Sequence, residues 1–258
     1  AFRISVADIT NDGYPDLIVH EIGNEMGGDV LDKIRIYKNE PNPDCDSKCT
    51  RIFTDWTEQS KIGIPWKGEG RHTNMAVFAD VDNDGDVDIY TGRYYHRNVE
   101  LVDKYNYLEL RLNNGEGVFE FPPKPLHTNL NDIQNKINCA AGTFCDYNLD
   151  GNIDLLVSGW FYEGSTNNPA NQLSLTGNGD GTFEVSHTIS GFGAFYCTAV
   201  ADVNNDHWPD LFVPSYTRQS GDPCYHWKNQ KGIDFTFETI SSNYAEYFYP
   251  MGSMTPFG

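Results

Sequence analysis

The chain has 258 residues, and its 37 acidic side chains outnumber its 18 basic ones, which gives a formal net charge of −19 at pH 7. Such a surface repels the phosphate backbone of nucleic acid, so nucleic-acid binding is excluded. Aromatic residues make up 14% of the sequence and supply enough apolar surface for a packed core, which excludes a disordered chain. No apolar run is long enough to predict a membrane-spanning helix. The first residues lack the basic and apolar regions of a signal peptide, so we expect a mature or trimmed chain.

One acidic pattern occurs four times along the sequence. The copies share a leading Asp, a second Asp four residues later and a third Asp eight residues later; they occupy residues 7–17, 79–89, 145–155 and 201–211. Their leading residues are Asp8, Asp80, Asp146 and Asp202. The unequal intervals between them favour repeated units with variable loops over a tightly stacked solenoid.

Each copy is flanked by segments that predict β-strands. A segment of small or alternating residues precedes the loop, at 2–7, 74–79, 140–145 and 195–201. A short apolar run follows it, at 17–19, 89–90, 155–157 and 211–213. A third strand is expected at 34–37, 107–112, 172–175 and 225–228, and an Asn/Gly-rich turn leads from it to a fourth.

Four short antiparallel strands per unit, with no amphipathic helical pattern between them, predict an all-β fold made of β-propeller blades. We expect one propeller domain or segment over residues 1–258. Its blades are expected at about 1–60, 71–125, 137–188 and 193–240, and residues 249–258 resemble the first strand of a further blade. The chain is therefore expected to be part of a longer protein with further blades or domains.

The acidic loops have the composition of calcium sites. Ca²⁺ takes six to eight oxygen ligands, which side chains at loop positions 1, 3, 5 and 9 and the carbonyl of position 7 can supply. The predicted ligands of the first two loops are Asp8, Thr10, Asp12, Tyr14 and Asp16, and Asp80, Asp82, Asp84, Asp86 and Asp88. Those of the last two are Asp146, Asn148, Asp150, Asn152 and Asp154, and Asp202, Asn204, Asp206, Trp208 and Asp210. The alternative is an Asp/Asn-rich turn whose carboxylates only cap backbone amides.

Two loops depart from the pattern. Thr10 stands at position 3 of the first loop, and His207 replaces the glycine at position 6 of the fourth. Histidine tolerates the left-handed backbone region better than most residues, so the fourth site is expected to survive in a weakened form. About four sites are predicted, and the second fits best.

Strands flank these loops, and the glutamate that ends an EF-hand loop is missing, so the sites are not EF-hands. The loops and the Asp-Leu-x-Val segments after them resemble FG-GAP/VCBS repeats, the blades of the integrin α-subunit propeller. Residues 172–183 are similar to the version in proteins related to cartilage acidic protein. The resemblance implies a calcium-binding propeller in an extracellular or cell-surface protein. It implies no single function, because such blades occur in adhesins, lectins and accessory parts of polysaccharide-degrading enzymes.

A ligand is expected on the face opposite the acidic loops, where the longer connections emerge. These connections carry aromatic and polar side chains suited to a glycan or a protein ligand: Arg93, Tyr94, Tyr95, His96, Trp160, Tyr162, Tyr216 and Arg218. The alternative is that these aromatic residues complete the core between blades. In the integrin resemblance, ligand recognition also uses the face away from calcium.

The six cysteines form no zinc or haem spacing. Cys45 and Cys49 are four apart, Cys139 and Cys145 are six apart, and we expect local disulfides in an oxidising compartment.

No catalytic motif is present, and the carboxylates that could act as acid and base belong mostly to the predicted calcium loops. We therefore expect a rigid scaffold for adhesion or ligand binding and no enzyme. The alternatives are a purely structural component and an accessory or catalytic propeller of a polysaccharide lyase or glycoside hydrolase.

Overall fold

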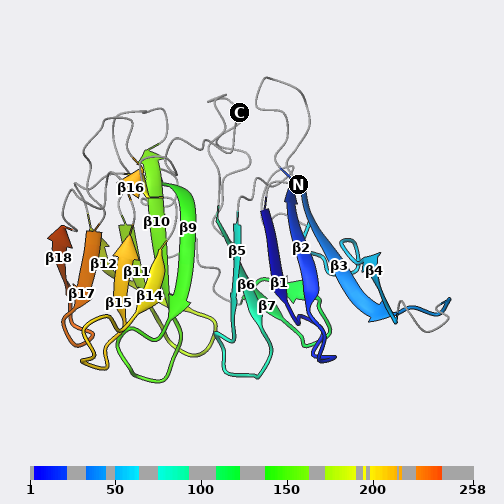
Figure 1. Cartoon of the computed structure of the whole chain (residues 1–258). Helices are drawn as coiled ribbons and strands as arrows, with labels where there is room; N and C mark the ends of the chain where they lie inside the picture. Colours follow the sequence, from blue (N-terminus) through cyan, green and yellow to red (C-terminus); the bar gives the residue numbers. More distant parts are fainter. Residues whose placement is uncertain are drawn as a thin grey trace. The chain divides into compact units, whose positions relative to one another are not determined.

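The computed structural model describes residues 3–21, 33–44, 50–63, 75–92, 109–122, 137–162, 172–189, 194–195, 198–213, 215–216 and 225–239. Every regular element within these ranges is a β-strand (Figure 1). In this part of the chain, no helix has the length and apolar character needed to cross a membrane.

Most of the described strands form four antiparallel sheets of four strands each, in which spatial order follows chain order. We call each of these sheets a blade and number them in chain order. The first blade contains β1 (Arg3–Ala7), β2 (Asp16–Glu21), β3 (Lys33–Pro41) and β4 (Arg51–Asp55). The second contains β5 (Met75–Ala79), β6 (Asp88–Gly92), β7 (Glu109–Asn113) and β8 (Phe119–Glu120). The predicted all-β architecture of four-stranded antiparallel units is confirmed.

The last two blades are less regular. The third contains β9 (Ile137–Cys145), β10 (Asp154–Tyr162), β11 (Gln172–Gly177) and β12 (Phe183–Ile189). The fourth contains β14 (Ala199–Ala201), β15 (Asp210–Val213), β17 (Tyr225–Asn229) and β18 (Phe235–Thr239). The strand predicted at 195–201 is divided, because β13 (Ala194–Phe195) pairs with β16 (Ser215–Tyr216) in a separate two-stranded sheet.

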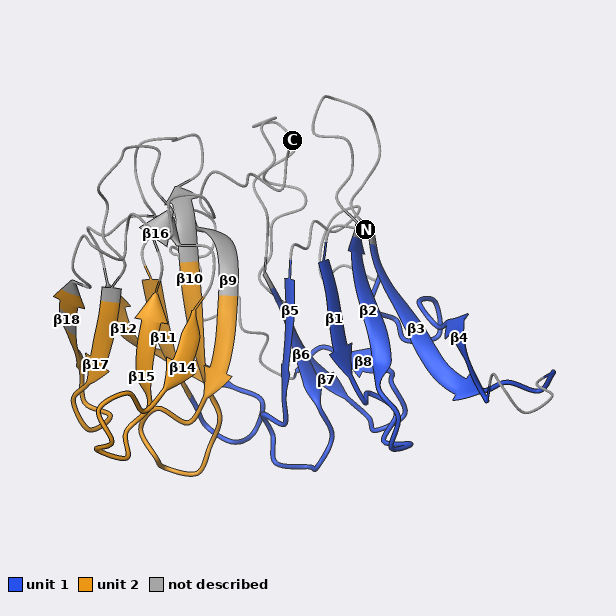
Figure 2. Ribbon diagram, viewed as in Figure 1, with its two compact units in different colours: residues 1–135, 177–182 blue, residues 136–176, 183–258 orange. Residues whose placement is uncertain are grey.

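The chain divides into two compact units, coloured separately in Figure 2. The first comprises residues 1–135 and 177–182, and the second comprises residues 136–176 and 183–258. Unit one therefore holds the first and second blades, and unit two holds the third and fourth, except for the turn at 177–182.

Each unit has its own core between its two blades. In unit one, Ile18 and Ile36 of the first blade pack with Ile89 and Phe119 of the second. In unit two, Leu156 of the third blade packs with residues of the fourth that include Leu211, Val213, Trp227 and Phe235. Side chains alternate along each strand, so every second residue reaches this core, and each fully buried large apolar side chain contributes about 1.5–3 kcal/mol.

Candidate metal centre

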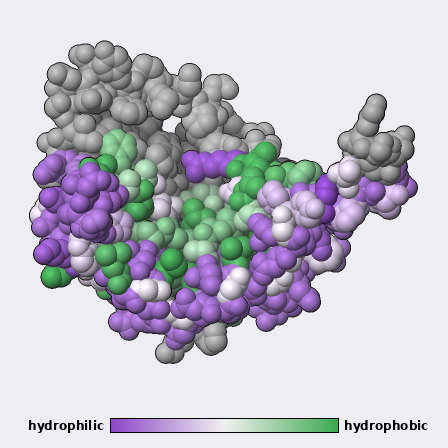
Figure 3. Space-filling view, turned by 60° about the horizontal axis from the view of Figure 1, so that its bottom comes forward, coloured by the Kyte–Doolittle hydropathy of each residue, from purple (hydrophilic) through white to green (hydrophobic). Residues whose placement is uncertain are grey.

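All four acidic loops occupy the same place in their blades, the hairpin between the first two strands. The last ladder pairs before the loops are Ala7 with Asp16, Ala79 with Asp88, Cys145 with Asp154, and Ala201 with Asp210. In each unit these hairpins lie at the lower end of the sheets in Figure 1. Figure 3 turns this end forward and shows many hydrophilic residues along it, as an acidic loop region requires.

The loops share one backbone path. Positions 4 and 6 of every loop have positive φ, which glycine adopts freely, which Asn, Asp and His tolerate, and which costs other side chains more. Position 4 is Asn11 (52°), Asn83 (61°), Leu149 (56°) and Asn205 (61°). Position 6 is Gly13 (84°), Gly85 (93°), Gly151 (92°) and His207 (73°). His207 therefore adopts the conformation expected of it, and the fourth loop follows the same bend as the others.

The leading aspartate of each loop accepts hydrogen bonds from the bend. In the second loop, the two carboxylate oxygens of Asp80 accept the amides of Asp84 at 3.1 Å and Gly85 at 3.0 Å. Equivalent pairs of bonds reach Asp8, Asp146 and Asp202. These bonds use part of each carboxylate's accepting capacity and fix its orientation, as the turn-capping alternative also requires.

The aspartate at position 9 is buried and joins the loop to the third strand. Asp88 is fully buried; one of its oxygens accepts the amide of Val81 at 2.9 Å and the other accepts the amide of Asn113 at 2.8 Å. Asp16 is held in the same way by the amides of Ile9 and Asn39. Position 9 therefore has a structural role whether or not a metal is bound.

The second loop brings three carboxylates together. One carboxylate oxygen from each of Asp80, Asp82 and Asp88 lies within 4.8 Å of the others. Within the described part of the chain, Oδ1 of Asp82 is buried and has no hydrogen-bond partner. An anionic oxygen in this situation is costly unless a cation approaches it. The donor set, all oxygen and mostly charged, fits a hard divalent ion such as Ca²⁺.

The pKa values in the second loop reflect the same crowding. The pKa of Asp88 is raised to about 7, mainly by burial and also by the charges of Asp82 and Asp84, whereas the hydrogen bonds from Val81 and Asn113 lower it. Burial, followed by the charges of Asp84 and Asp80, also raises the pKa of Asp82. A nearby cation would stabilise the charged carboxylates and reverse these shifts.

The first loop already contains a positive group. Arg51 of β4 lies 3.2 Å from Oδ2 of Asp12, and its guanidinium stacks at 3.4 Å from the ring centroid of Tyr14. Thr10 donates its hydroxyl to Asp16 at 3.4 Å. Burial raises the pKa of Asp16, as it does for Asp88. Arg51 thus partly neutralises one predicted calcium ligand.

Amide side chains replace carboxylates at position 3 of the last two loops. The Oδ1 atoms of Asn148 and Asn204 accept the amides of Asp150 at 2.9 Å and Asp206 at 2.8 Å. Their Nδ2 atoms donate to Asp150 and to Asp210. These loops therefore hold less negative charge than the second loop. Their amide side chains also donate hydrogen bonds to the carboxylates that remain.

The residues at position 7 were predicted to contribute only their carbonyls, and their side chains differ widely. That of Tyr14 packs beneath Arg51, and that of Asp86 accepts a hydrogen bond from Asn11 of the first loop. The second loop is therefore in direct contact with the first inside unit one.

One class of site residue escaped the sequence analysis, an asparagine at or near the end of the third strand. Asn39, Asn113 and Asn229 donate their backbone amides to the position-9 aspartates at 2.7, 2.8 and 2.8 Å. Their position one or two residues after the third strands predicted at 34–37, 107–112 and 225–228 was the available signal. In the third blade Gly177 ends the equivalent strand.

The predicted ligand face is not covered by the structure. Arg93, Tyr94, Tyr95, His96 and Arg218 lie outside the described residues. Trp160 and Tyr162 belong to β10 and Tyr216 to β16, but only their backbone is described.

The expected local disulfide is wrong for Cys145, whose thiol is free. Cys139 and Cys145 lie six residues apart on the same strand, β9. A strand rises about 3.3 Å per residue, so the two residues lie much farther apart than the roughly 7 Å limit for a disulfide. Cys45, Cys49, Cys197 and Cys224 lie outside the described residues.

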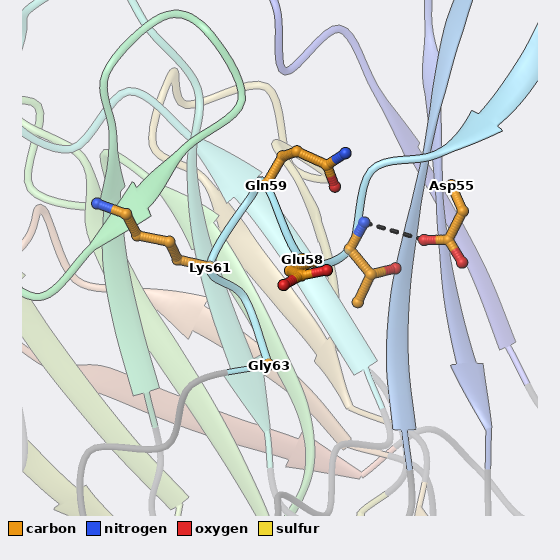
Figure 4. A pocket seen from close by; sticks show the side chains of 6 residues that line it. Asp55, Glu58, Gln59, Lys61 and Gly63 are labelled. Carbon is orange, nitrogen blue, oxygen red and sulfur yellow. Dashed lines mark hydrogen bonds between the residues drawn. The ribbon is translucent and has the colours of Figure 1, made fainter.

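An open pocket of about 620 Å³ lies beside the turn after β4 and contains none of the predicted site residues. It is lined by Asp55, Thr57, Glu58, Gln59, Lys61 and Gly63 (Figure 4). Asp55 accepts the amide of Thr57 at 3.0 Å, and Lys61 pairs with Glu120 at 2.9 Å. Asp55 and Lys61 are thus engaged with protein partners, and the acidic loops remain the stronger candidate site.

A search of curated proteins finds no match. One matching solved structure is a lectin of Agrocybe aegerita, described as specifically recognising non-reducing terminal N-acetylglucosamine. It aligns with a TM-score of 0.47 and 16% identity over 93% of this chain and 52% of the lectin chain, so this chain spans about half the lectin's length.

A comparison with protein-family models matches two long stretches of the chain. The model of the FG-GAP-like repeat matches residues 8–91 and 146–213, two stretches that each begin at the leading aspartate of an acidic loop. FG-GAP repeats form β-propellers, so the four-stranded sheets are propeller blades. The chain belongs to the FG-GAP-like repeat family.

Proposed function

We propose that the acidic loops bind Ca²⁺ and that the chain is a calcium-stabilised propeller scaffold in an extracellular or cell-surface protein. The observation that carries this proposal is the second loop. There, the oxygens of Asp80, Asp82 and Asp88 converge within 4.8 Å, and Oδ1 of Asp82 lacks a partner within the described residues. Membership of the FG-GAP-like repeat family supports the choice of calcium.

The residues that would hold the ion are the predicted set in each loop. In the second loop they are Asp80, Asp82, Asp84 and Asp88 with the carbonyl of Asp86. Bound calcium would neutralise carboxylates that otherwise repel one another and would tie the hairpin to the buried position-9 aspartate. The remaining loops follow the same backbone path, but Thr10, Asn148 and Asn204 lower their charge, so we expect them to bind more weakly.

Charge over the whole chain favours the same conclusion. Four divalent ions would add +8 to the formal charge of −19 and leave −11. Lower self-repulsion favours the compact state. Calcium is therefore expected to contribute strongly to folding stability, as any ligand that binds only the native state does.

The role we propose for the scaffold is to present a rigid surface to a glycan or protein ligand, without catalysis. Carboxylates that might act as acid and base are engaged in the loops. The ligand surface predicted around Arg93–His96, Trp160 and Tyr216 stays a prediction, and a glycan array probed with calcium and with a chelator would test it.

Calorimetric titration of the metal-stripped chain with CaCl₂ tests the calcium proposal, together with thermal melts with and without chelator. We expect calcium to raise the Tm and the Asp82→Asn variant to lose the tightest site. Asp44→Asn, which alters an exposed carboxylate outside all four loops, is the matched control and should behave like the parent. An unchanged Tm and no binding heat in the parent chain would refute calcium binding.

A further inference from the structure

Asp86 contributes a different group to each of two loops. It stands at position 7 of the second loop, so its backbone carbonyl belongs to the predicted ligand set of that loop. Its carboxylate accepts a hydrogen bond from Nδ2 of Asn11, which belongs to the first loop. Within the described residues, this carboxylate accepts no other hydrogen bond. One residue therefore forms part of the predicted site of the second loop and also holds a side chain of the first.

Asn11 lies between two predicted ligands of the first loop. It stands at position 4, between Thr10 and Asp12, and its φ is 52°. Asparagine tolerates this left-handed conformation. A hydrogen bond to a charged carboxylate is stronger than one between neutral groups. When Asp86 holds Asn11, the two neighbouring ligands lose conformational freedom as well.

The turn between β7 and β8 lies against both loops. A Cβ added at Gly115 would lie 2.6 Å from Oδ2 of Asp86, which is closer than Cβ atoms approach, so the backbone of the turn borders this carboxylate. A Cβ added at Gly117 would lie 3.0 Å from Cγ2 of Thr10. The amide of Gly117 donates to Oδ1 of Asn113 at 3.1 Å, which attaches the turn to the third strand. A shift of either loop towards this turn would displace the same backbone.

Unit two lacks this link, although its acidic hairpins have the same form. Position 4 of the third loop is Leu149, whose side chain has no donor, and position 7 of the fourth loop is Trp208. The ring of Trp208 lies against its own turn, because a Cβ added at Gly232 would be 3.1 Å from it. The hydrogen bond between Asn11 and Asp86 is therefore particular to the first two loops and is not a requirement of the blade fold.

Two effects of this link act in the same direction. Ordering one loop fixes one partner of the hydrogen bond between Asn11 and Asp86, which lowers the entropy cost of ordering the other loop. The negative charge of Asp86 lies where the two loops meet, so it attracts a cation in either loop and offsets the repulsion between two cations. The affinity of each loop should therefore be higher when the other loop is occupied.

We propose that the first and second loops bind Ca²⁺ with positive cooperativity and that the side chains of Asn11 and Asp86 carry the coupling. This inference rests on the proposed calcium binding and adds its regulation: unit one responds to calcium over a narrower concentration range than two independent sites do. Linkage requires that each loop raise the affinity of the other by the same factor. We expect a factor of about three to ten, as one exposed hydrogen bond to a charged group can supply.

Nuclear magnetic resonance with selective ¹⁵N labelling of glycine follows the loops separately. Position 6 is Gly13 in the first loop, Gly85 in the second and Gly151 in the third, so each of these loops has its own amide probe. Titration of the metal-stripped chain with CaCl₂ gives one binding midpoint per probe. Asp82→Asn disables the second loop. We expect it to raise the calcium midpoint of Gly13 about threefold to tenfold and to change that of Gly151, in unit two, less than about twofold.

The effect of Asp82→Asn is then measured in chains that lack the link. Asp86→Ala removes the acceptor, and Asn11→Gly removes the donor but keeps a residue that adopts positive φ. In either chain, Asp82→Asn should leave the Gly13 midpoint in place. Asp86→Asn is the matched control, because it makes the same change in charge as Asp86→Ala but keeps a side-chain oxygen for Asn11. It should retain a shift of at least about twofold.

The outcomes separate the coupling from calcium binding itself. If calcium changes none of the three glycine probes in the parent chain, calcium binding is refuted and the coupling with it. If Gly13 and Gly85 both respond but Asp82→Asn leaves the Gly13 midpoint unchanged, the coupling is overturned and calcium binding stands. A first loop that binds no calcium in the parent chain also overturns the coupling. A full shift that persists with both Asp86→Ala and Asn11→Gly overturns the role of these two side chains.

Discussion

The side chain of Asn113 donates a hydrogen bond of 2.8 Å to the backbone carbonyl of Ile9, which belongs to the acidic loop of the preceding blade. The backbone amide of Asn113 donates at the same distance to Asp88, the last predicted metal ligand of its own loop. One residue thus connects two successive acidic loops within unit one. Order in one loop is expected to support order in the next.

Removing this connection should be costly. In the Asn113→Ala variant, the carbonyls of Ile9 and Val87 lose their donor, and a small cavity remains beside the buried Asp88. Buried acceptors without partners cost about 1–3 kcal/mol each, so we expect a loss of roughly 2–4 kcal/mol in the free energy of unfolding. Urea denaturation in saturating calcium measures this loss.

Asn39→Ala is the matched control, because Nδ2 of Asn39 contacts only its own blade within the described residues. We expect it to cost about half as much as Asn113→Ala or less. Asn229→Ala should resemble Asn113→Ala, since Asn229 donates to Tyr147 in the same manner. Equal losses for all three variants would contradict a specific role in joining blades.

Leu149 is predicted to hold a strained backbone conformation, which a substitution at this position can relieve. It stands at position 4 of the third loop with φ of 56°, where the other loops have asparagine, and it is 49% exposed. A left-handed conformation costs a branched side chain roughly 1 kcal/mol more than asparagine. Leu149→Asn should raise the free energy of unfolding by about 0.5–1 kcal/mol, and Asn83→Leu should lower it by a similar amount, both measured by urea denaturation. If neither variant changes the free energy of unfolding, the backbone of these loops is not under strain.

The sequence was sufficient to predict the hairpins, because each acidic loop carries the three aspartates of positions 1, 5 and 9 between two strands. Loop 4 kept its bend despite His207, since histidine accepts positive φ. The role of the asparagines was hidden because their distance from the position-9 aspartate varies, at 23 residues for Asn39, 25 for Asn113 and 19 for Asn229. Only the pairing of strands in the folded chain brings the three asparagines to equivalent positions. The disulfide prediction failed because spacing in sequence does not show that Cys139 and Cys145 share one extended strand.

Arg51 is expected to weaken calcium binding at the first loop. Its guanidinium lies 3.2 Å from Asp12 and must leave, or share, this carboxylate when an ion binds. Arg51→Gln removes the competing charge, and we expect the calcium affinity of the first loop to rise about threefold to tenfold. Calcium titration by calorimetry measures the change.

The control for Arg51 is Arg35→Gln, which breaks a comparable pair with Asp55, 3.4 Å apart and outside the loops. It should leave all calcium affinities unchanged. If both variants raise affinity equally, the effect reflects net charge alone and the local competition is refuted.

Cys145 is expected to be unreactive in the folded chain. Burial, with the charges of Asp154 and Asp146, raises the pKa of its thiol to about 12. Because the thiolate is the nucleophile, alkylation at pH 8 should be at least tenfold slower than in urea. Peptide mapping after iodoacetamide treatment follows this cysteine separately from the other five. Equal rates in the folded and unfolded chain would contradict the buried position.

Stability without metal should fall as pH rises towards neutrality. Burial raises the pKa of Asp88 to about 7, whereas an aspartate in an unfolded chain titrates near 3.9. Between these values the folded chain binds more protons than the unfolded chain, so the free energy of unfolding decreases with increasing pH. Calcium competes with these protons, and its affinity should therefore fall as pH drops below about 7. Thermal melts of the metal-stripped chain from pH 4.5 to 7.5, compared with Asp88→Asn, isolate this contribution: the variant should lose stability less steeply with pH, and equal slopes would refute the assignment to Asp88.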